Sequence, residues 1–172
     1  EAQALIAGPT AEDPAYVEEC RNLVGSLGLQ AQVRFLGMQK IDDLLPRVGL
    51  VVLSSISEAL PLVLLEAQAA GVPVVSTDVG SCRQLIEGLE PEDRALGACG
   101  RVVGIANPAA LADAALELLQ SPEAWQAASA AGIARVERYY TQEMMIGSYH
   151  ELYARLQAMP DLGIEHGTQT AA

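Results

Sequence analysis

The chain has 172 residues, of which 51% are hydrophobic and 19% are charged, and its formal net charge at pH 7 is −12. This length and composition allow a core of ordinary domain size, so we expect a globular protein. A nucleic-acid surface needs clustered Lys and Arg, and the 10 basic residues are scattered among 22 acidic ones, which excludes nucleic acid as a partner.

Short apolar runs alternate with helical patterns along the first two thirds of the chain, which is typical of βαβ units on a parallel sheet. The run "LVVLSS" at residues 50–55 is apolar on both faces, as a central parallel strand is. The sequence therefore predicts one α/β domain over residues 1–158, with a parallel sheet flanked by helices. The predicted strands cover residues 3–7, 32–37, 50–55, 72–77 and 100–104.

Capping residues and prolines mark the helix starts. Asp13 precedes Pro14, and Pro61 precedes an apolar helical run that Gly71 ends. After Met159-Pro160 no hydrophobic period remains, so residues 159–172 are expected to form a mobile tail. The predicted helices cover residues 14–27, 41–48, 62–70 and 82–86, followed by three that start after Asn107, Ser121 and Thr141, the last ending near residue 156.

The cysteines indicate the compartment. Cys20, Cys82 and Cys99 fit neither a zinc pattern nor a disulfide framework, so we expect reduced thiols in a cytoplasmic protein. No apolar run reaches the roughly 18 residues that span a bilayer, and the given sequence does not open with a basic region followed by a hydrophobic segment, so we expect no targeting signal in it. Because the sequence starts at Glu1 and enters a buried strand within four residues, we expect an N-terminally truncated fragment.

Two glutamates flank the start of the helix that follows the third predicted strand. In open α/β sheets, ligands bind beyond the carboxyl ends of the strands, next to helix N-termini that favour anions. Glu58 lies in that loop, and Glu66 lies four residues beyond Leu62, about 6 Å along the helix axis. Helical side chains lean toward the N-terminus, so the Glu66 carboxylate should face the same crevice. A nucleoside diphosphate sugar has an anionic diphosphate between two groups that carry hydroxyls. A helix start that binds the anion, with a carboxylate on either side to accept hydrogen bonds from the hydroxyls, suits such a ligand.

Structural or surface roles are the alternatives to ligand binding for each of these residues. Two acids alone are weak evidence, since Glu58 fits a solvated loop residue and Glu66 an acid on a helix surface. Asp78 and Ser81 either touch substrate or shape a turn and cap a helix. Arg83 either reaches a phosphate or forms a surface ion pair. His150, at helical spacing from apolar residues, fits a packed or half-exposed side chain better than a catalytic one.

The surrounding sequence carries a family resemblance. The stretch "SEALPLVLLEAQAAGVPVVSTDVGS" at 57–81, together with "IAGP", "VRFLG" and "NPAALADAALELL", resembles the C-terminal, donor-binding half of family 4 retaining glycosyltransferases. The resemblance covers most of the chain and implies a Rossmann-like domain that forms one half of a GT-B fold. Its members often carry glycine at the position of Ala59, so a positive φ there would strain this chain.

The resemblance also implies residue roles. Glu58 would be the catalytic-site residue that contacts hydroxyls of the transferred sugar, and Glu66 would bind the ribose hydroxyls. The nucleotide base would lie near residues 37–40. No protein nucleophile is indicated, and neither a cofactor nor a metal is expected. The backbone that would cradle sugar and diphosphate belongs to Ala59, Leu60, Pro61, Leu62 and Val63.

The implied donor is a UDP-sugar, with UDP-glucose the expected one, and the narrower resemblance is to members that act in exopolysaccharide synthesis. The expected partners are the donor, an N-terminal acceptor domain and membrane-associated polysaccharide-synthesis proteins. Without that domain and the family's Arg/Lys pair, the fragment should be inactive, and its few contacts, worth about 4 to 6 kcal/mol, give roughly millimolar affinity. Two alternatives stay open: a noncatalytic sugar-nucleotide binding or assembly module, and a fragment of a nucleotide-sugar epimerase.

Overall fold

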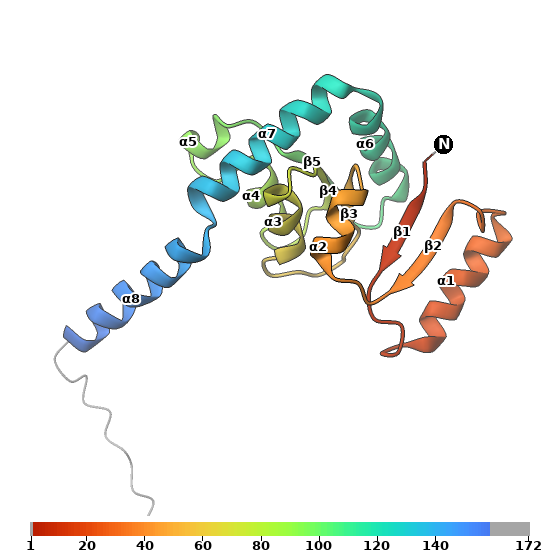
Figure 1. Ribbon diagram of the computed structural model, residues 1–172, viewed down its shortest axis with the longest axis horizontal. Coiled ribbons are helices and arrows are strands. Elements are labelled where there is room, and N and C mark those ends of the chain that lie inside the picture. Colours follow the sequence, from red (N-terminus) through yellow and green to blue (C-terminus); the bar gives the residue numbers. More distant parts are fainter. Residues whose placement is uncertain (1, 159–172) are drawn as a thin grey trace, which may run out of the picture. The chain divides into compact units, whose positions relative to one another are not determined.

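A computed structural model describes residues 2–158 of the protein, so the tail predicted at 159–172 lies outside the described residues. The chain divides into two compact units, residues 1–49 and 50–172, and each is described by itself. Strands and helices alternate in both, which confirms the predicted α/β class (Figure 1). The prediction of a single domain over residues 1–158 stays a prediction.

The first unit holds a pair of parallel strands and a helix that connects them. β1 pairs with β2 from Ala4 opposite Val33 onward. As predicted, Asp13 caps α1: its Oδ1 accepts a hydrogen bond from the Tyr16 N–H at 3.0 Å, and Pro14 is the first helical residue. The elements are β1 (Ala4–Ala7), α1 (Pro14–Ser26), β2 (Val33–Gly37), α2 (Ile41–Leu44) and the 3₁₀ turn η1 (Leu45–Arg47).

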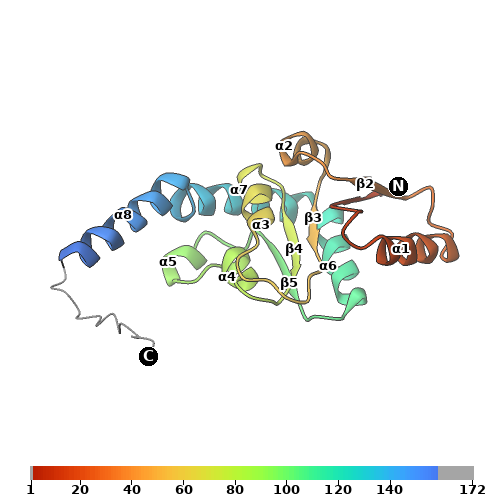
Figure 2. The ribbon, with the colours of Figure 1, turned by 90° about the horizontal axis from the view of Figure 1, so that it is seen from below.

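The second unit holds a parallel sheet in the order β3-β4-β5. All residues of the middle strand β4 are buried, as expected of a strand covered on both faces. Both views place α6 on the opposite side of this sheet from α3 and α4 (Figure 1, Figure 2). The elements are β3 (Val51–Leu53), α3 (Leu62–Ala69), β4 (Val74–Thr77), α4 (Cys82–Glu87), α5 (Pro91–Arg94), β5 (Gly100–Val103), α6 (Pro108–Gln120), α7 (Pro122–Tyr139) and α8 (Gln142–Ala158).

The core of the second unit lies where α6 and α7 meet the sheet. Val75 of β4 packs with Ala114 and Leu118 of α6 and with Ala128 of α7. The caps predicted for these helices are present, since Asn107 accepts from the Ala110 N–H and Ser121 from the Ala124 N–H. By contrast, α8 has no buried residue, and its apolar side chains are exposed.

Three features differ from the sequence-based expectations. The run at residues 50–55 was expected to be a central strand, but β3 lies at one edge of the β3-β4-β5 sheet and none of its residues is fully buried. The described strands pair as two sheets, β1-β2 and β3-β4-β5, rather than as the single sheet that the alternating pattern suggested. The short helix α5 was not predicted, because its four residues show no hydrophobic period and no side chain caps it. It forms because one of its acids, Asp93, is buried against a cation from far along the chain.

That cation is Arg135 of α7, which is fully buried and donates four hydrogen bonds. Its Nε donates to Asp93 Oδ1 at 2.6 Å, Nη1 to the Ile86 carbonyl at 2.9 Å, and Nη2 to the carbonyls of Asp93 and Gly97 at 3.0 and 2.8 Å. The other oxygen of Asp93 accepts from the Leu89 N–H at 3.0 Å. The pair therefore ties α7 to α5 and to the end of α4.

The replacement Arg135→Met should lower the free energy of unfolding by about 3 to 5 kcal/mol, because it leaves the buried Asp93 carboxylate without its cation. Urea unfolding followed by circular dichroism measures the change. The matched control is Arg101→Met, which breaks an exposed ion pair between Arg101 and Glu117 and should cost far less. Equal losses in the two variants would contradict the structural role of Arg135.

Candidate functional site

The loop between β3 and α3 holds Glu58 at the carboxyl end of the sheet. Ser55 Oγ donates a hydrogen bond to Glu58 Oε1 at 2.7 Å, which fixes the half-buried carboxylate against its own loop. Ser55 lies two residues after the last residue of β3, Leu53, at the carboxyl edge of the sheet, where ligands bind in parallel sheets. The structure thus gives Glu58 a defined orientation rather than the freedom of a solvated loop acid.

Helix α3 begins directly after this loop and presents an uncapped N-terminus. It starts at Leu62 after Pro61, and no side chain hydrogen-bonds to its first turn. The Leu64 N–H reaches the Pro61 carbonyl at 3.2 Å, so the N–H groups of Leu62 and Val63 remain as the donors that an α-helix leaves without intrahelical partners. Such donors, together with the helix dipole, favour an anion at this position.

Glu66 lies one turn into the same helix. Its side chain is exposed, whereas the next residues, Ala67 and Gln68, are buried. Within residues 2–158 the structure gives the Glu66 carboxylate no hydrogen bond or ion pair, so its oxygens are available to hydroxyl donors. The segment 58–66 therefore carries one oriented acid, one exposed acid and the helix start between them.

Ala59 fits this loop without strain. Among the described residues the only non-glycine with positive φ is Ala106, so the backbone at Ala59 does not need a glycine. Replacement of the family's frequent glycine is therefore tolerated here.

The loop after β4 supports the loop after β3. Thr77 Oγ1 donates to the Ser55 carbonyl, and the Ser81 N–H donates to the Ala59 carbonyl at 2.9 Å. The Ser81 side chain makes no capping hydrogen bond to α4. The sequence analysis did not identify Ser55 and Thr77 as site residues. Hydroxyl residues at the ends of the two apolar runs were the signal that could have indicated them.

Arg83 forms the surface ion pair that was one of its two predicted roles. Its Nη2 lies 2.7 Å from Asp78 Oδ2 and its Nη1 lies 2.7 Å from Glu87 Oε1, with the guanidinium half exposed. Hydrogen bonds to Asp78 and then to Glu87 raise the pKa of Arg83. Asp78 is therefore engaged with α4.

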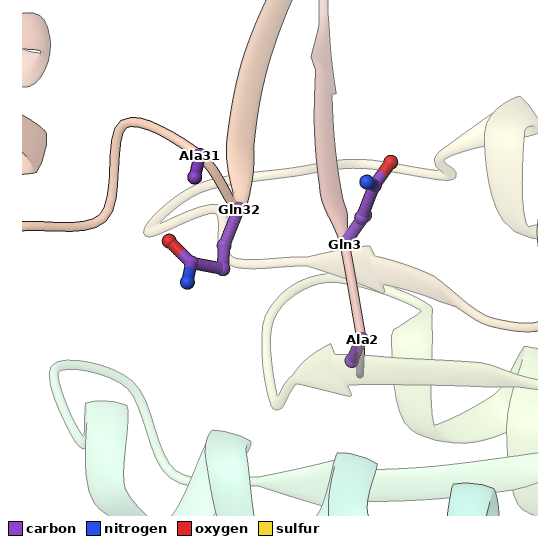
Figure 3. Close-up of a pocket in the computed structure, with 4 residues that line it drawn as sticks. All are labelled: Ala2, Gln3, Ala31 and Gln32. Atoms are coloured by element: carbon purple, nitrogen blue, oxygen red, sulfur yellow. The ribbon is translucent and has the colours of Figure 1, made fainter.

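Other candidate features lie elsewhere. His150 is exposed on α8. A small cavity of about 80 Å³ lies between the amino-terminal ends of β1 and β2 and is lined by Ala2, Gln3, Ala31 and Gln32 (Figure 3). Ligands of open α/β sheets bind at the carboxyl ends of the strands, so this cavity is at the opposite edge. Residues 2–158 contain no cluster of three acidic, histidine or cysteine side chains able to hold a metal. None of the helices described in this range combines the length and the hydropathy that a transmembrane span requires.

Comparison with known proteins gives consistent matches. Residues 1–135 match the family described as "Glycosyl transferases group 1". The chain is 31% identical over 155 residues to the lipopolysaccharide core biosynthesis mannosyltransferase LpsB of Rhizobium meliloti, covering 89% of this chain and 42% of that protein. It is 32% identical over 165 residues to a D-inositol 3-phosphate glycosyltransferase of Corynebacterium urealyticum, covering 92% and 36%. The chain thus spans about two fifths of the length of these relatives.

Solved structures share the fold. A sucrose-phosphate synthase from Thermosynechococcus elongatus superposes with a TM-score of 0.77 at 26% identity, over 91% of this chain and 39% of that one. Anabaena HepE in complex with UDP-glucose superposes with a TM-score of 0.79 at 22% identity, over 89% and 41%. These neighbours are GT-B proteins, which confirms the predicted α/β fold with parallel sheets flanked by helices.

The Ser55→Ala variant should lose about 1 kcal/mol in the free energy of unfolding, because the half-buried Glu58 loses its only described hydrogen-bond donor. Chemical denaturation measures it. Ser54→Ala is the matched control, since the neighbouring Ser54 is exposed and makes no described hydrogen bond. If both variants unfold alike, the Ser55–Glu58 contact does not persist in solution.

Proposed function

Because this chain belongs to the glycosyl transferases group 1 family, we propose that its segment 58–66 binds the nucleotide-sugar donor of a retaining glycosyltransferase. The observation that carries the proposal is the uncapped start of α3 beside the oriented Glu58 carboxylate. A diphosphate needs N–H donors and a sugar needs oxygen acceptors, and this segment offers both within a few residues.

The proposed roles follow the chemistry of each group. The backbone of residues 59–63 cradles the sugar and the diphosphate, with the N–H groups of Leu62 and Val63 facing the negative charge. Glu58 accepts hydrogen bonds from hydroxyls of the transferred sugar, and Glu66 accepts them from the ribose. The exposed Glu66 and the Ser55-bound Glu58 support these roles because both keep at least one carboxylate oxygen open to a ligand.

The proposed reaction breaks the bond between the anomeric carbon and the diphosphate oxygen. The oxygen of an acceptor hydroxyl forms the new bond on the same face of the sugar, and its proton passes to the departing diphosphate, which leaves as the nucleoside diphosphate. The negative charge that develops on the leaving diphosphate is stabilised by the start of α3, which is already oriented before reaction. No protein nucleophile is part of this proposal.

The finer proposal is that the donor is UDP-glucose and that the whole protein is cytoplasmic and acts in exopolysaccharide synthesis. The relative HepE was solved with UDP-glucose, which supports a UDP-sugar. The wording "SSISEALPLVLLEA" with "DVGSCRQLIEG" resembles PelF of Pel exopolysaccharide synthesis. An N-terminal acceptor domain and membrane-associated synthesis proteins are the proposed partners.

This chain by itself is proposed to be inactive and to bind donor at roughly millimolar affinity. The helix start and a few hydrogen bonds to carboxylates are the contacts that segment 58–66 offers, and together they contribute about 4 to 6 kcal/mol. The surrounding charge is unfavourable, because the chain carries a net charge of −12 and the donor is an anion.

The two acids should give different binding signatures with UDP-glucose and UDP. Glu58→Gln should weaken UDP-glucose about tenfold and leave UDP unchanged, because the proposed contact is with the sugar alone. Glu66→Gln should weaken both ligands about tenfold, because the ribose is common to them. A factor of ten corresponds to about 1.4 kcal/mol, the lower range of a hydrogen bond to a charged group. Titrations followed by amide chemical shifts of this chain measure both affinities.

Glu137→Gln is the matched control, since Glu137 is an exposed helical acid on α7 with no described ion pair. Wild-type affinity in both Glu58→Gln and Glu66→Gln would refute the site. Hydrolysis of UDP-glucose, measured with a chain that includes the proposed N-terminal acceptor domain, separates a transferase from a noncatalytic binding module, which would bind donor without turnover. Interconversion of UDP-sugars instead would indicate an epimerase.

A further inference from the structure

Gly80, in the loop between β4 and α4, lies directly against the backbone of Glu58 and Ala59. Its φ is +50°, and a Cβ built on it would lie 2.6 Å from the Ala59 carbonyl oxygen and still closer to that of Glu58. Real Cβ atoms do not approach backbone oxygens this closely, so any side chain at position 80 must push the two peptides away. No flexible side chain stands there to give way.

The contacts around Gly80 fix its loop from both ends. The Ser81 N–H donates to the Ala59 carbonyl at 2.9 Å, and Thr77 Oγ1 donates to the Ser55 carbonyl. Helix α4, which follows directly, is anchored by Cys82, Leu85 and Ile86, all fully buried. The loop 78–81 is therefore held in place by these contacts, and residues 55–59 pack against it.

We propose that Gly80 is a positioning residue for the Glu58 carboxylate, because its missing side chain lets the β4 loop close on the Glu58 and Ala59 carbonyls. The proposal rests on the proposed function and deepens it by assigning control of the sugar subsite to the neighbouring loop. Only three residues separate Glu58 from the first residue of α3, so a displaced Glu58 peptide changes the placement of the acid relative to the helix start. Displacements of about 1 Å at such sites reduce rates and affinity strongly.

The geometric part is tested without ligand. In Gly80→Ala, amide resonances of Glu58, Ala59 and Leu62 should shift relative to wild type. The matched control is Gly97→Ala in the same unit, because Gly97 also has a left-handed φ, +88°, but its Cβ would meet only Ala131 Cβ at 3.9 Å. The control therefore carries the backbone strain without the clash. Unmoved resonances at 58–62 in Gly80→Ala would overturn the proposal.

The functional part is tested by titrating UDP-glucose and UDP into the same variants. Gly80→Ala should weaken UDP-glucose about tenfold and UDP less than threefold, because the sugar contact depends on Glu58 and the diphosphate contact on α3. Gly97→Ala should bind both like wild type. Gly80→Asn should give the same affinities as Gly80→Ala, because asparagine adopts a left-handed φ at lower cost but its Cβ meets the same carbonyl oxygens. If the alanine variant does not fold, the asparagine variant is used for the test.

The two failures are distinguishable. Wild-type chain that binds neither UDP-glucose nor UDP would refute the proposed function, and the role of Gly80 with it. Wild-type chain that binds UDP-glucose while Gly80→Ala and Gly80→Asn bind it equally well would refute the role of Gly80 alone. Equal weakening by Gly80→Ala and Gly97→Ala would assign the effect to backbone strain and would also overturn the proposal.

Discussion

The parallel pairing of β3 with β4 is the constraint on which the candidate site depends. Because both strands run in the same direction, their carboxyl ends meet at one edge, and the loops that follow them lie against each other. The hydrogen bonds from Thr77 to Ser55 and from Ser81 to Ala59 exist only because of this arrangement. An antiparallel pair would place these loops at opposite edges.

The division of work within segment 58–66 follows from its secondary structure. The start of α3 supplies backbone N–H groups, which remain when side chains are substituted. The hydrogen-bond acceptors, in contrast, are the side chains of Glu58, which Ser55 orients, and Glu66, which is exposed to solvent. Under the proposed function, the anion site is inherent in the fold, and selectivity for the group attached to the anion lies in the two glutamates. This separation suits a family whose members, LpsB and the D-inositol 3-phosphate glycosyltransferase among them, are named for different reactions.

Local signals in the sequence predicted much of the fold and the loop that carries the candidate site. Caps at Asp13, Asn107 and Ser121 and the ion pair of Arg83 depend on residues at most five positions apart, so spacing reveals them. The Arg135–Asp93 pair spans 42 positions and the Thr77–Ser55 bond spans 22, and no local pattern encodes such distances. Helix α5 was missed for the same reason, since its one buried residue, Asp93, pairs with the distant Arg135. The close fit at Gly80 was also hidden, because a glycine in a turn looks the same whether or not another chain segment touches it.

The Thr77 hydroxyl has a consequence for how the sheet finds its alignment during folding. All four residues of β4 are buried, so its side chains do not alternate between a buried and an exposed face. Such an alternation therefore cannot distinguish the native pairing register of β4 from one shifted by a single residue. A shift would withdraw the hydroxyl from the Ser55 carbonyl and bring the side chain of Val79 or Ser81 to the place where only hydrogen fits at Gly80. Misaligned pairing is therefore penalised at the strand ends, by the same contacts that shape the loop around Glu58.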